Sequence, residues 1–228
     1  MTTAPPAPAQ RRRDLGPVGT LAGSEIGRLQ KGYLEDRPDA VAALARLRRG
    51  AGKDTSTIPD LWGLLDADPL HADPALDQDA AHTALYTAAT LYSLHQQSRG
   101  TRMHRPGGDE LGTAVRRLMP GGDMDEPTRK RFVRAGSAAT MPVLATRLRE
   151  IVLLLRREDI TLDYALLAEQ LYQWQQLPAG PDSVRRSWGR SLHAHRAKPA
   201  DPAGGDATAD TTAGTTDTDT DDRKDSAQ

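Results

Sequence analysis

The chain of 228 residues contains no cysteine and only one phenylalanine. Without cysteine it can hold neither a disulfide framework nor a metal site built on thiolates, which excludes zinc fingers. No run of about 18 uncharged apolar residues occurs, so we expect no membrane span. Residues 1–14 lack the apolar segment of a secretory signal. These absences predict a cytoplasmic protein that does not bind a membrane.

The charge of the chain is unevenly distributed. The net formal charge is -1, but residues 201–228 hold eight Asp and two basic residues, so the other 200 residues carry +5. Most basic residues are arginines, whose planar guanidinium groups suit phosphate oxygens. GC-rich coding produces the same excess of arginine. Net charge alone therefore does not establish nucleic-acid binding.

Both ends of the chain have the composition of disordered segments. Residues 1–20 are rich in proline, and residues 197–228 consist mainly of Ala, Thr, Gly and Asp without an aromatic residue. Such segments bury too little apolar surface to offset the entropy lost on ordering. Alternating aspartates from Asp217 resemble a calcium loop, but Asp222 and Gln228 stand where an EF-hand needs Gly and Glu. We therefore expect a solvated acidic tail.

Between the ends, the spacing of apolar residues is helical and no segment alternates as a strand does. We expect helices over residues 24–36, 38–49, 77–98, 109–119, 126–137, 144–155, 164–174 and 181–195. The clearest face is formed by Leu144, Leu148, Ile151 and Leu155, at steps of 4, 3 and 4. These patterns predict an all-α fold.

Several single residues carry more specific expectations. Ser24 and Asp163 are candidate N-caps, and Pro38 suits the first turn of a helix. The aromatic residues Trp62, Tyr164 and Trp174 are expected in the core, in preference to surfaces on which bases stack.

Motifs of catalysis are missing. The sequence contains no nucleophile elbow, P-loop or dinucleotide-binding glycine pattern, and its six histidines have no metal-ligand spacing. Carboxylates are scattered and often adjoin arginine. We therefore predict no catalytic residue, no cofactor and no metal. A helical enzyme whose site is assembled only by folding stays open as an alternative.

Basic residues form four clusters. They are Arg46, Arg48, Arg49 and Lys53; Arg99, Arg102, His104 and Arg105; Arg116 and Arg117; and Arg129, Lys130, Arg131 and Arg134. Some of these cations complement the C-terminal end of a helix dipole, and others are candidates for intramolecular salt bridges. In the fourth cluster Arg131 and Arg134 share a helix face, while Phe132 and Val133 face elsewhere and can anchor the helix.

We predict that part of this set binds a nucleic-acid backbone through charge and shape, without reading bases. The predicted nucleic-acid-binding residues are Arg48, Arg49, Lys53, Arg105, Arg116, Arg117, Arg131 and Arg134. A scaffold that binds only proteins, with its arginines paired to acidic partners, is the alternative.

Several stretches between Ser24 and His195 resemble one known family. They are Ala45–Gly50 followed by Ile58–Trp62, Leu91–Gln96, Leu111–Ala114, Arg131–Ala135, and Leu162–Ala168 followed by Tyr172–Trp174. In this order and spacing they resemble the CasB family, the small subunit of the type I-E CRISPR Cascade complex. The best-matched cations are Arg48, Arg49 and Arg134.

The resemblance implies a non-catalytic protein of two helical bundles, which we place at residues 21–120 and 121–196. It implies two copies along a crRNA-guided complex, in contact with the backbone and large subunits. It also implies a basic surface that supports the crRNA–target duplex and the displaced DNA strand, and so stabilises the R-loop for antiviral defence. In such a system base pairing reads sequence, and protein reads charge and shape.

Overall fold

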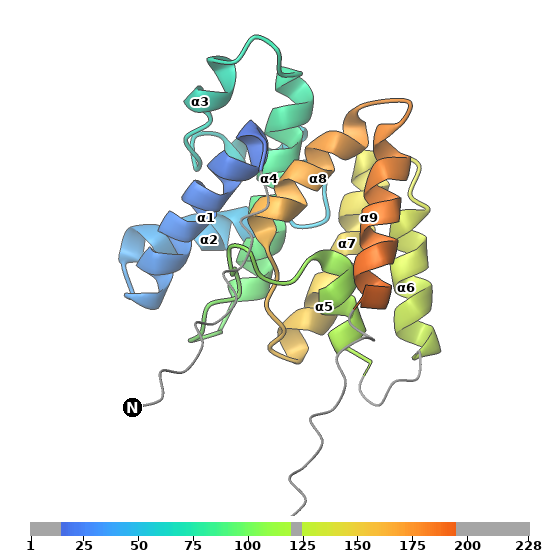
Figure 1. Ribbon diagram of the computed structural model, residues 1–228. Coiled ribbons are helices and arrows are strands. Elements are labelled where there is room, and N and C mark those ends of the chain that lie inside the picture. Colours follow the sequence, from blue (N-terminus) through green and yellow to red (C-terminus); the bar gives the residue numbers. More distant parts are fainter. Residues whose placement is uncertain (1–14, 120–124, 195–228) are drawn as a thin grey trace, which may run out of the picture. The chain divides into compact units, whose positions relative to one another are not determined.

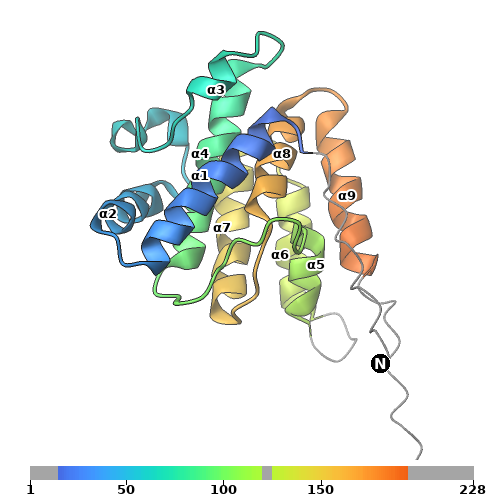
Figure 2. The same cartoon turned by 60° about the vertical axis from the view of Figure 1, so that its left-hand side comes forward.

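The computed structural model describes residues 15–119 and 125–194, which fold as helices joined by short loops (Figures 1 and 2). The α-helices are α1 (Pro17–Leu34), α2 (Pro38–Leu47), α3 (Asp68–His71), α4 (Gln78–Gln96), α5 (Leu111–Arg117), α6 (Glu126–Gly136), α7 (Met141–Arg157), α8 (Tyr164–Gln175) and α9 (Gly180–Ala194). Three 3-10 turns, η1 (Arg48–Gly50), η2 (Thr55–Thr57) and η3 (Pro59–Leu61), follow α2. The predicted all-α class is confirmed.

Helix α4 lies at the centre of the described part. It packs against α1, α2, α7 and α8, and every residue from Ala84 to Gln96 is buried. The helix has alanine, threonine and leucine around its whole circumference, as expected of a helix surrounded by others. Asp77 caps it by accepting from the Ala80 backbone N–H at 3.0 Å.

Helix α1 begins at Pro17, seven residues before the predicted cap at Ser24, which lies inside the helix. The reason is a tertiary contact. The Gly19 N–H donates to the carboxylate of Glu169 on α8 at 2.9 Å. A carboxylate at this position satisfies an unpaired amide and complements the positive end of the helix dipole. The predicted disorder of residues 1–20 is thus wrong for the residues from Pro17 onwards.

Other local expectations are confirmed. Pro38 opens α2, and Asp163 caps α8 by accepting from two backbone N–H groups at 3.1 Å. Leu144, Leu148, Ile151 and Leu155 form a buried face of α7. Tyr164 and Trp174 belong to the core, where the Trp174 ring stacks on Trp188 of α9 with centroids 5.9 Å apart.

A single hydrophobic core runs through the described helices on both sides of residue 120. Helices α1 and α4 pack directly on α8, and α5 packs on α9. The structure therefore shows no separate core on each side, and the division at residues 120 and 121 stays a prediction. The predicted tails fall almost entirely in residues 1–14 and 195–228, outside the described residues.

Candidate nucleic-acid interface

The loop that follows α2 carries the first cation cluster and lies against α7. Thr146 of α7 donates its hydroxyl to the Gly52 carbonyl at 2.9 Å. The aliphatic stem of Arg149 lies against Gly52, whose φ of +79° suits glycine. The loop therefore brings Lys53 close to Arg149, an exposed cation that sequence spacing did not single out because it lies almost 100 residues away. Arg48 is half-buried, and Lys53 is exposed.

Asp60 engages the other two arginines of this cluster. Arg46 Nη2 donates to the Asp60 carbonyl oxygen at 2.8 Å, and Arg49 Nη1 pairs with the Asp60 carboxylate at 3.3 Å. The side chains of Arg49 and Asp60 are 67% and 62% exposed. An ion pair so exposed to water is weak and can be exchanged for a phosphate at little cost. Arg49 thus remains a candidate.

Two buried glutamines fix the loop that carries Arg105. Gln30 of α1 accepts from the His104 N–H at 2.8 Å and donates to its carbonyl at 3.1 Å. Gln96 donates to the carbonyl oxygens of Arg99 and Thr101, both at 2.8 Å. The loop is therefore held from inside, which leaves the Arg105 side chain exposed.

Two members of the second cluster have structural roles. His104 belongs to this cluster by sequence but is buried, and burial lowers its pKa. Arg99 pairs with Asp159 and donates to the Arg156 carbonyl, which ties the loop to the end of α7.

The third cluster is engaged within the protein. Arg117 pairs with Asp109 at 2.6 Å, with only 24% of the Asp109 side chain exposed. Arg116 is half-buried and reaches the sulfur of Met119. A phosphate would have to displace these contacts, so Arg116 and Arg117 are the weakest of the predicted binding residues.

Helix α6 divides its cations between two uses. Arg129 and Lys130 both pair with Glu126, whereas Arg131 and Arg134 form no ion pair with any described residue. The positive charge of Arg131 still contributes to the lowered pKa of Asp125, after the hydrogen bonds from Thr128. Phe132 anchors the helix, with its ring centroid 6.5 Å from that of Trp188. Val133 is 49% exposed, so the expectation that it also anchors the helix was wrong.

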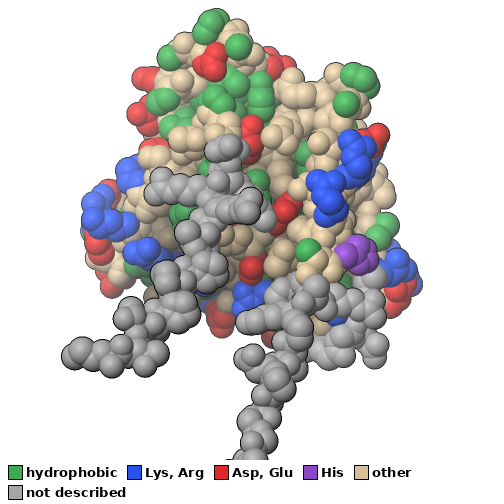
Figure 3. All heavy atoms as spheres, viewed as in Figure 1, with side chains coloured by type: hydrophobic (Ala, Val, Ile, Leu, Met, Phe, Trp, Pro, Cys, Tyr) green, Lys and Arg blue, Asp and Glu red, His purple; other side chains and the backbone are tan. Residues whose placement is uncertain are grey.

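The clusters do not merge into one stripe. In both ribbon views α2 and α6 lie well apart (Figures 1 and 2). Helix α7 contacts both regions, since it packs on α6 and its Thr146 and Arg149 touch the Gly52 loop. Sequence reasoning also missed Arg186 and Arg190 of α9, which are exposed, one turn apart, and form no ion pair within the described ranges. Basic side chains gather over this helix in Figure 3.

Trp62 was predicted in the core and instead lies on the surface, with 59% of the residue exposed. The neighbouring apolar residues Leu61 and Leu65 are buried in its place. In an irregular segment no fixed period tells which apolar residue points inward, which is why the pattern failed here.

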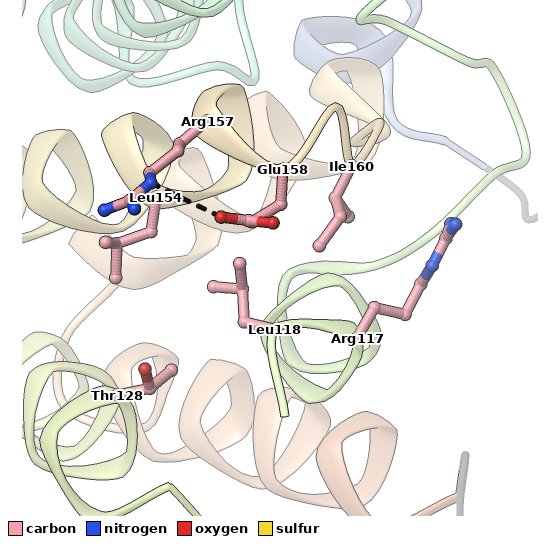
Figure 4. Close-up of a pocket in the computed structure, with 7 residues that line it drawn as sticks. All are labelled: Arg117, Leu118, Thr128, Leu154, Arg157, Glu158 and Ile160. Carbon is pink, nitrogen blue, oxygen red and sulfur yellow. Dashed lines mark ion pairs between the residues drawn. The ribbon is translucent and has the colours of Figure 1, made fainter. Parts of the chain in front are cut away.

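A pocket of about 520 Å³ opens between the ends of α5 and α7 and the start of α6 (Figure 4). Its described lining includes a carboxylate, Glu158, that pairs with Arg157 at 3.5 Å, while the Arg117 side chain points away from it. This arrangement gives no described acid and base facing one another across a substrate-sized space. The pocket therefore adds no support to the enzyme alternative.

Comparison with known proteins identifies a family whose model covers most of the described helices. The family model of the CRISPR-associated protein Cse2 matches residues 43–193, from α2 to α9. The crystal structure of CasB from Thermobifida fusca is 52% identical, over 79% of this chain and 99% of that one, with a TM-score of 0.72. The chain belongs to the Cse2 family. The resemblance to CasB seen in the sequence is confirmed.

Other structures support the Cse2 fold. A CRISPR-associated protein of the Cse2 family from Thermus thermophilus is 25% identical, over 77% of this chain and 97% of that one, with a TM-score of 0.58. A chain of a CRISPR RNA-guided surveillance complex shares the fold at 20% identity, over 78% of this chain and 96% of that one, with a TM-score of 0.59. A comparison with curated proteins gave no match. Within the described ranges, no helix has the length and apolarity to cross a membrane.

Proposed function

We propose that this Cse2-family chain is a non-catalytic small subunit of a type I-E CRISPR RNA-guided surveillance complex. In this role it binds the phosphate backbones of the crRNA–target duplex and of the displaced DNA strand, and it stabilises the R-loop in the cytoplasm. Its partners are the backbone and large subunits and a second copy of itself. Family membership supports the assembly, and the surface cations support the binding.

One observation carries the binding proposal. Five of the eight predicted residues form no ion pair with any described residue, namely Arg48, Lys53, Arg105, Arg131 and Arg134. Cations held on helices and short loops without a carboxylate partner keep their full charge for an external anion. Releasing condensed counterions from a nucleic acid then supplies much of the binding free energy.

The direct test is R-loop lifetime in the assembled complex. We expect Arg131→Ala with Arg134→Ala to shorten the lifetime about tenfold, if the two contacts together contribute about 1.4 kcal/mol. Arg129→Ala is the matched control on the same helix, because Arg129 already pairs with Glu126. A second set, Arg48→Ala with Lys53→Ala and Arg149→Ala, has Arg147→Ala as its control, since Arg147 pairs with Glu150 on α7.

The outcomes separate binding from scaffolding. Variants that assemble but lose R-loops faster than their controls support backbone binding. Variants that fold, assemble and hold R-loops as long as the wild type would contradict it. Loss of assembly with unchanged nucleic-acid affinity would instead favour the protein-binding scaffold.

A further inference from the structure

Trp62 stands apart from the other aromatic residues of the chain. All nine aromatic residues lie in the described ranges, and the other eight are buried or half-buried. Exposing an indole to water gives up about 2 kcal/mol or more of burial free energy. An exposed indole offers a large apolar face that gains free energy when another molecule covers it.

The turn around Trp62 holds the indole outside. Its backbone N–H donates to the Pro59 carbonyl at 3.0 Å, closing η3. Leu61 and Leu65 are buried on either side of it, and Gly63 has a φ of +71°. Turning the indole inward would expose one of these two leucines. The exposure of Trp62 therefore follows from the burial of Leu61 and Leu65.

Arginines adjoin this turn. Asp60, two residues before Trp62, accepts from Arg46 through its carbonyl and pairs with Arg49 through its carboxylate. These two guanidinium groups belong to the same cluster as Arg48 and Lys53, for which we proposed backbone binding. An aromatic face beside a cation cluster is the combination that holds single strands, with phosphates on the cations and bases on the ring.

A nucleic acid fits this surface better than a protein does. Tryptophan at the centre of a protein interface is normally surrounded by apolar surface. Val41, an exposed apolar side chain of α2, the helix that packs against η3, lies in the first half of that helix. Arg46, which reaches Asp60 in the Trp62 turn, lies near the end of α2. The turn that carries Trp62 is thus in contact with arginines.

We infer that Trp62 is a platform on which an unpaired base of a nucleic-acid strand stacks, while the strand's phosphates lie on the neighbouring cation cluster. The inference rests on the proposed function and narrows the partner at this surface. Bases within a duplex are already stacked on each other, so the occupant is single-stranded.

The test uses the full-length protein and three probes of equal length: an oligothymidylate, an abasic oligonucleotide with the same phosphates, and a duplex. Trp174 and Trp188 are 4% and 1% exposed, so base-dependent quenching of tryptophan fluorescence reports on Trp62. We expect the oligothymidylate to quench and to bind about 5- to 150-fold more tightly than the abasic strand. Neither the abasic strand nor the duplex should quench.

Three variants sharpen the result. Trp62→Ala should abolish the quenching and bring the two single strands to equal affinity, while Trp62→Phe should keep most of the preference. Arg48→Ala with Lys53→Ala should weaken both strands and leave their affinity ratio unchanged. Since Trp62 is exposed, unfolding curves of its variants should match the wild type.

Failure of the inference and failure of the proposed function look different. Equal binding of both single strands by the wild type, without quenching, would overturn the stacking platform and leave backbone binding in place. No binding of any probe at low salt would overturn both. If Trp62→Ala binds all probes as the wild type does but fails to assemble into the complex, the platform is a protein contact and the inference is wrong.

Discussion

At the scale of single residues, two buried histidines make the fold sensitive to acid. Burial lowers the pKa of His95 from 6.5 to about 3 and also lowers that of His104. His104 Nδ1 accepts from the Tyr164 N–H at 3.1 Å, so a proton added there would break that hydrogen bond. His95 Nδ1 lies 2.9 Å from the Tyr164 hydroxyl. No described residue offers a hydrogen-bond partner to the Nε2 atom of either ring.

These pKa values predict how stability depends on pH. Between the unfolded pKa of 6.5 and the folded value of about 3, the unfolded chain binds a proton at His95 that the folded chain does not. Stability is therefore complete above pH 6.5 and falls as the pH drops below it, by about 1.4 kcal/mol per pH unit for each such histidine. Urea unfolding at pH 7, 6 and 5 measures this slope.

The variant His95→Gln should reduce that slope, whatever its absolute stability. A wild-type free energy of unfolding that stays flat from pH 7 to pH 5 would show that the buried rings do not couple folding to protonation.

At the scale of elements, α5 and α9 are in very close contact at Gly112. A methyl group at this position would overlap the Trp188 carbonyl oxygen and the Ser191 hydroxyl of α9. Gly112→Ala should therefore lower the free energy of unfolding by about 1–3 kcal/mol, as overpacked core positions do.

The matched control for this packing prediction is Gly27→Ala in α1, where a methyl group would meet no atom within 4 Å beyond its chain neighbours and the backbone of its own helix. There alanine should raise the stability by about 0.5–1 kcal/mol through its better helix propensity. If Gly112→Ala unfolds at the same denaturant concentration as the wild type, α5 and α9 are not packed as the structure describes.

The local sequence predicts where most helices lie, but it predicts few of the contacts between segments that are far apart in the chain. Apolar spacing was sufficient for α7 and α8, and the Asp163 carboxylate marked the start of α8 correctly. The start of α1 depends on Glu169, some 150 residues away, so no local signal could reveal it. Arg149 was missed for the same reason, because only folding places it on the Gly52 loop.

The sequence predicted where the cations cluster, but not which of them pair with carboxylates in the fold. Clustering located the cations, but it could not distinguish Arg117, which pairs with Asp109, from Arg134, which pairs with no described residue. That distinction depends on which carboxylates the fold brings near. Trp62 shows the same limit, since its exposure follows from the burial of Leu61 and Leu65.

At the scale of the whole molecule, the described cations without carboxylate partners occur in separate regions. They lie on the loop after α2, on the loop between α4 and α5, on α6 and on the exposed face of α9. A protein that binds more than one strand needs contacts in more than one place, and this distribution meets that need. The ion pairs of Glu126 on α6 and of Glu150 on α7 lie within a single helix, at i,i+3 or i,i+4, and engage other cations of the same helices. The number of basic residues alone does not distinguish cations in ion pairs from cations without carboxylate partners.

The salt dependence of nucleic-acid binding tests the central claim most directly. Affinity of the full-length protein for a non-specific single strand is measured across a salt series, for the wild type, for Arg131→Ala with Arg134→Ala, and for Arg129→Ala. The double variant should lose about 0.7 units of slope in log affinity against log salt for each phosphate contact removed from the single strand. The control should keep the wild-type slope. Identical slopes for all three proteins would contradict the claim that cations without carboxylate partners bind the backbone.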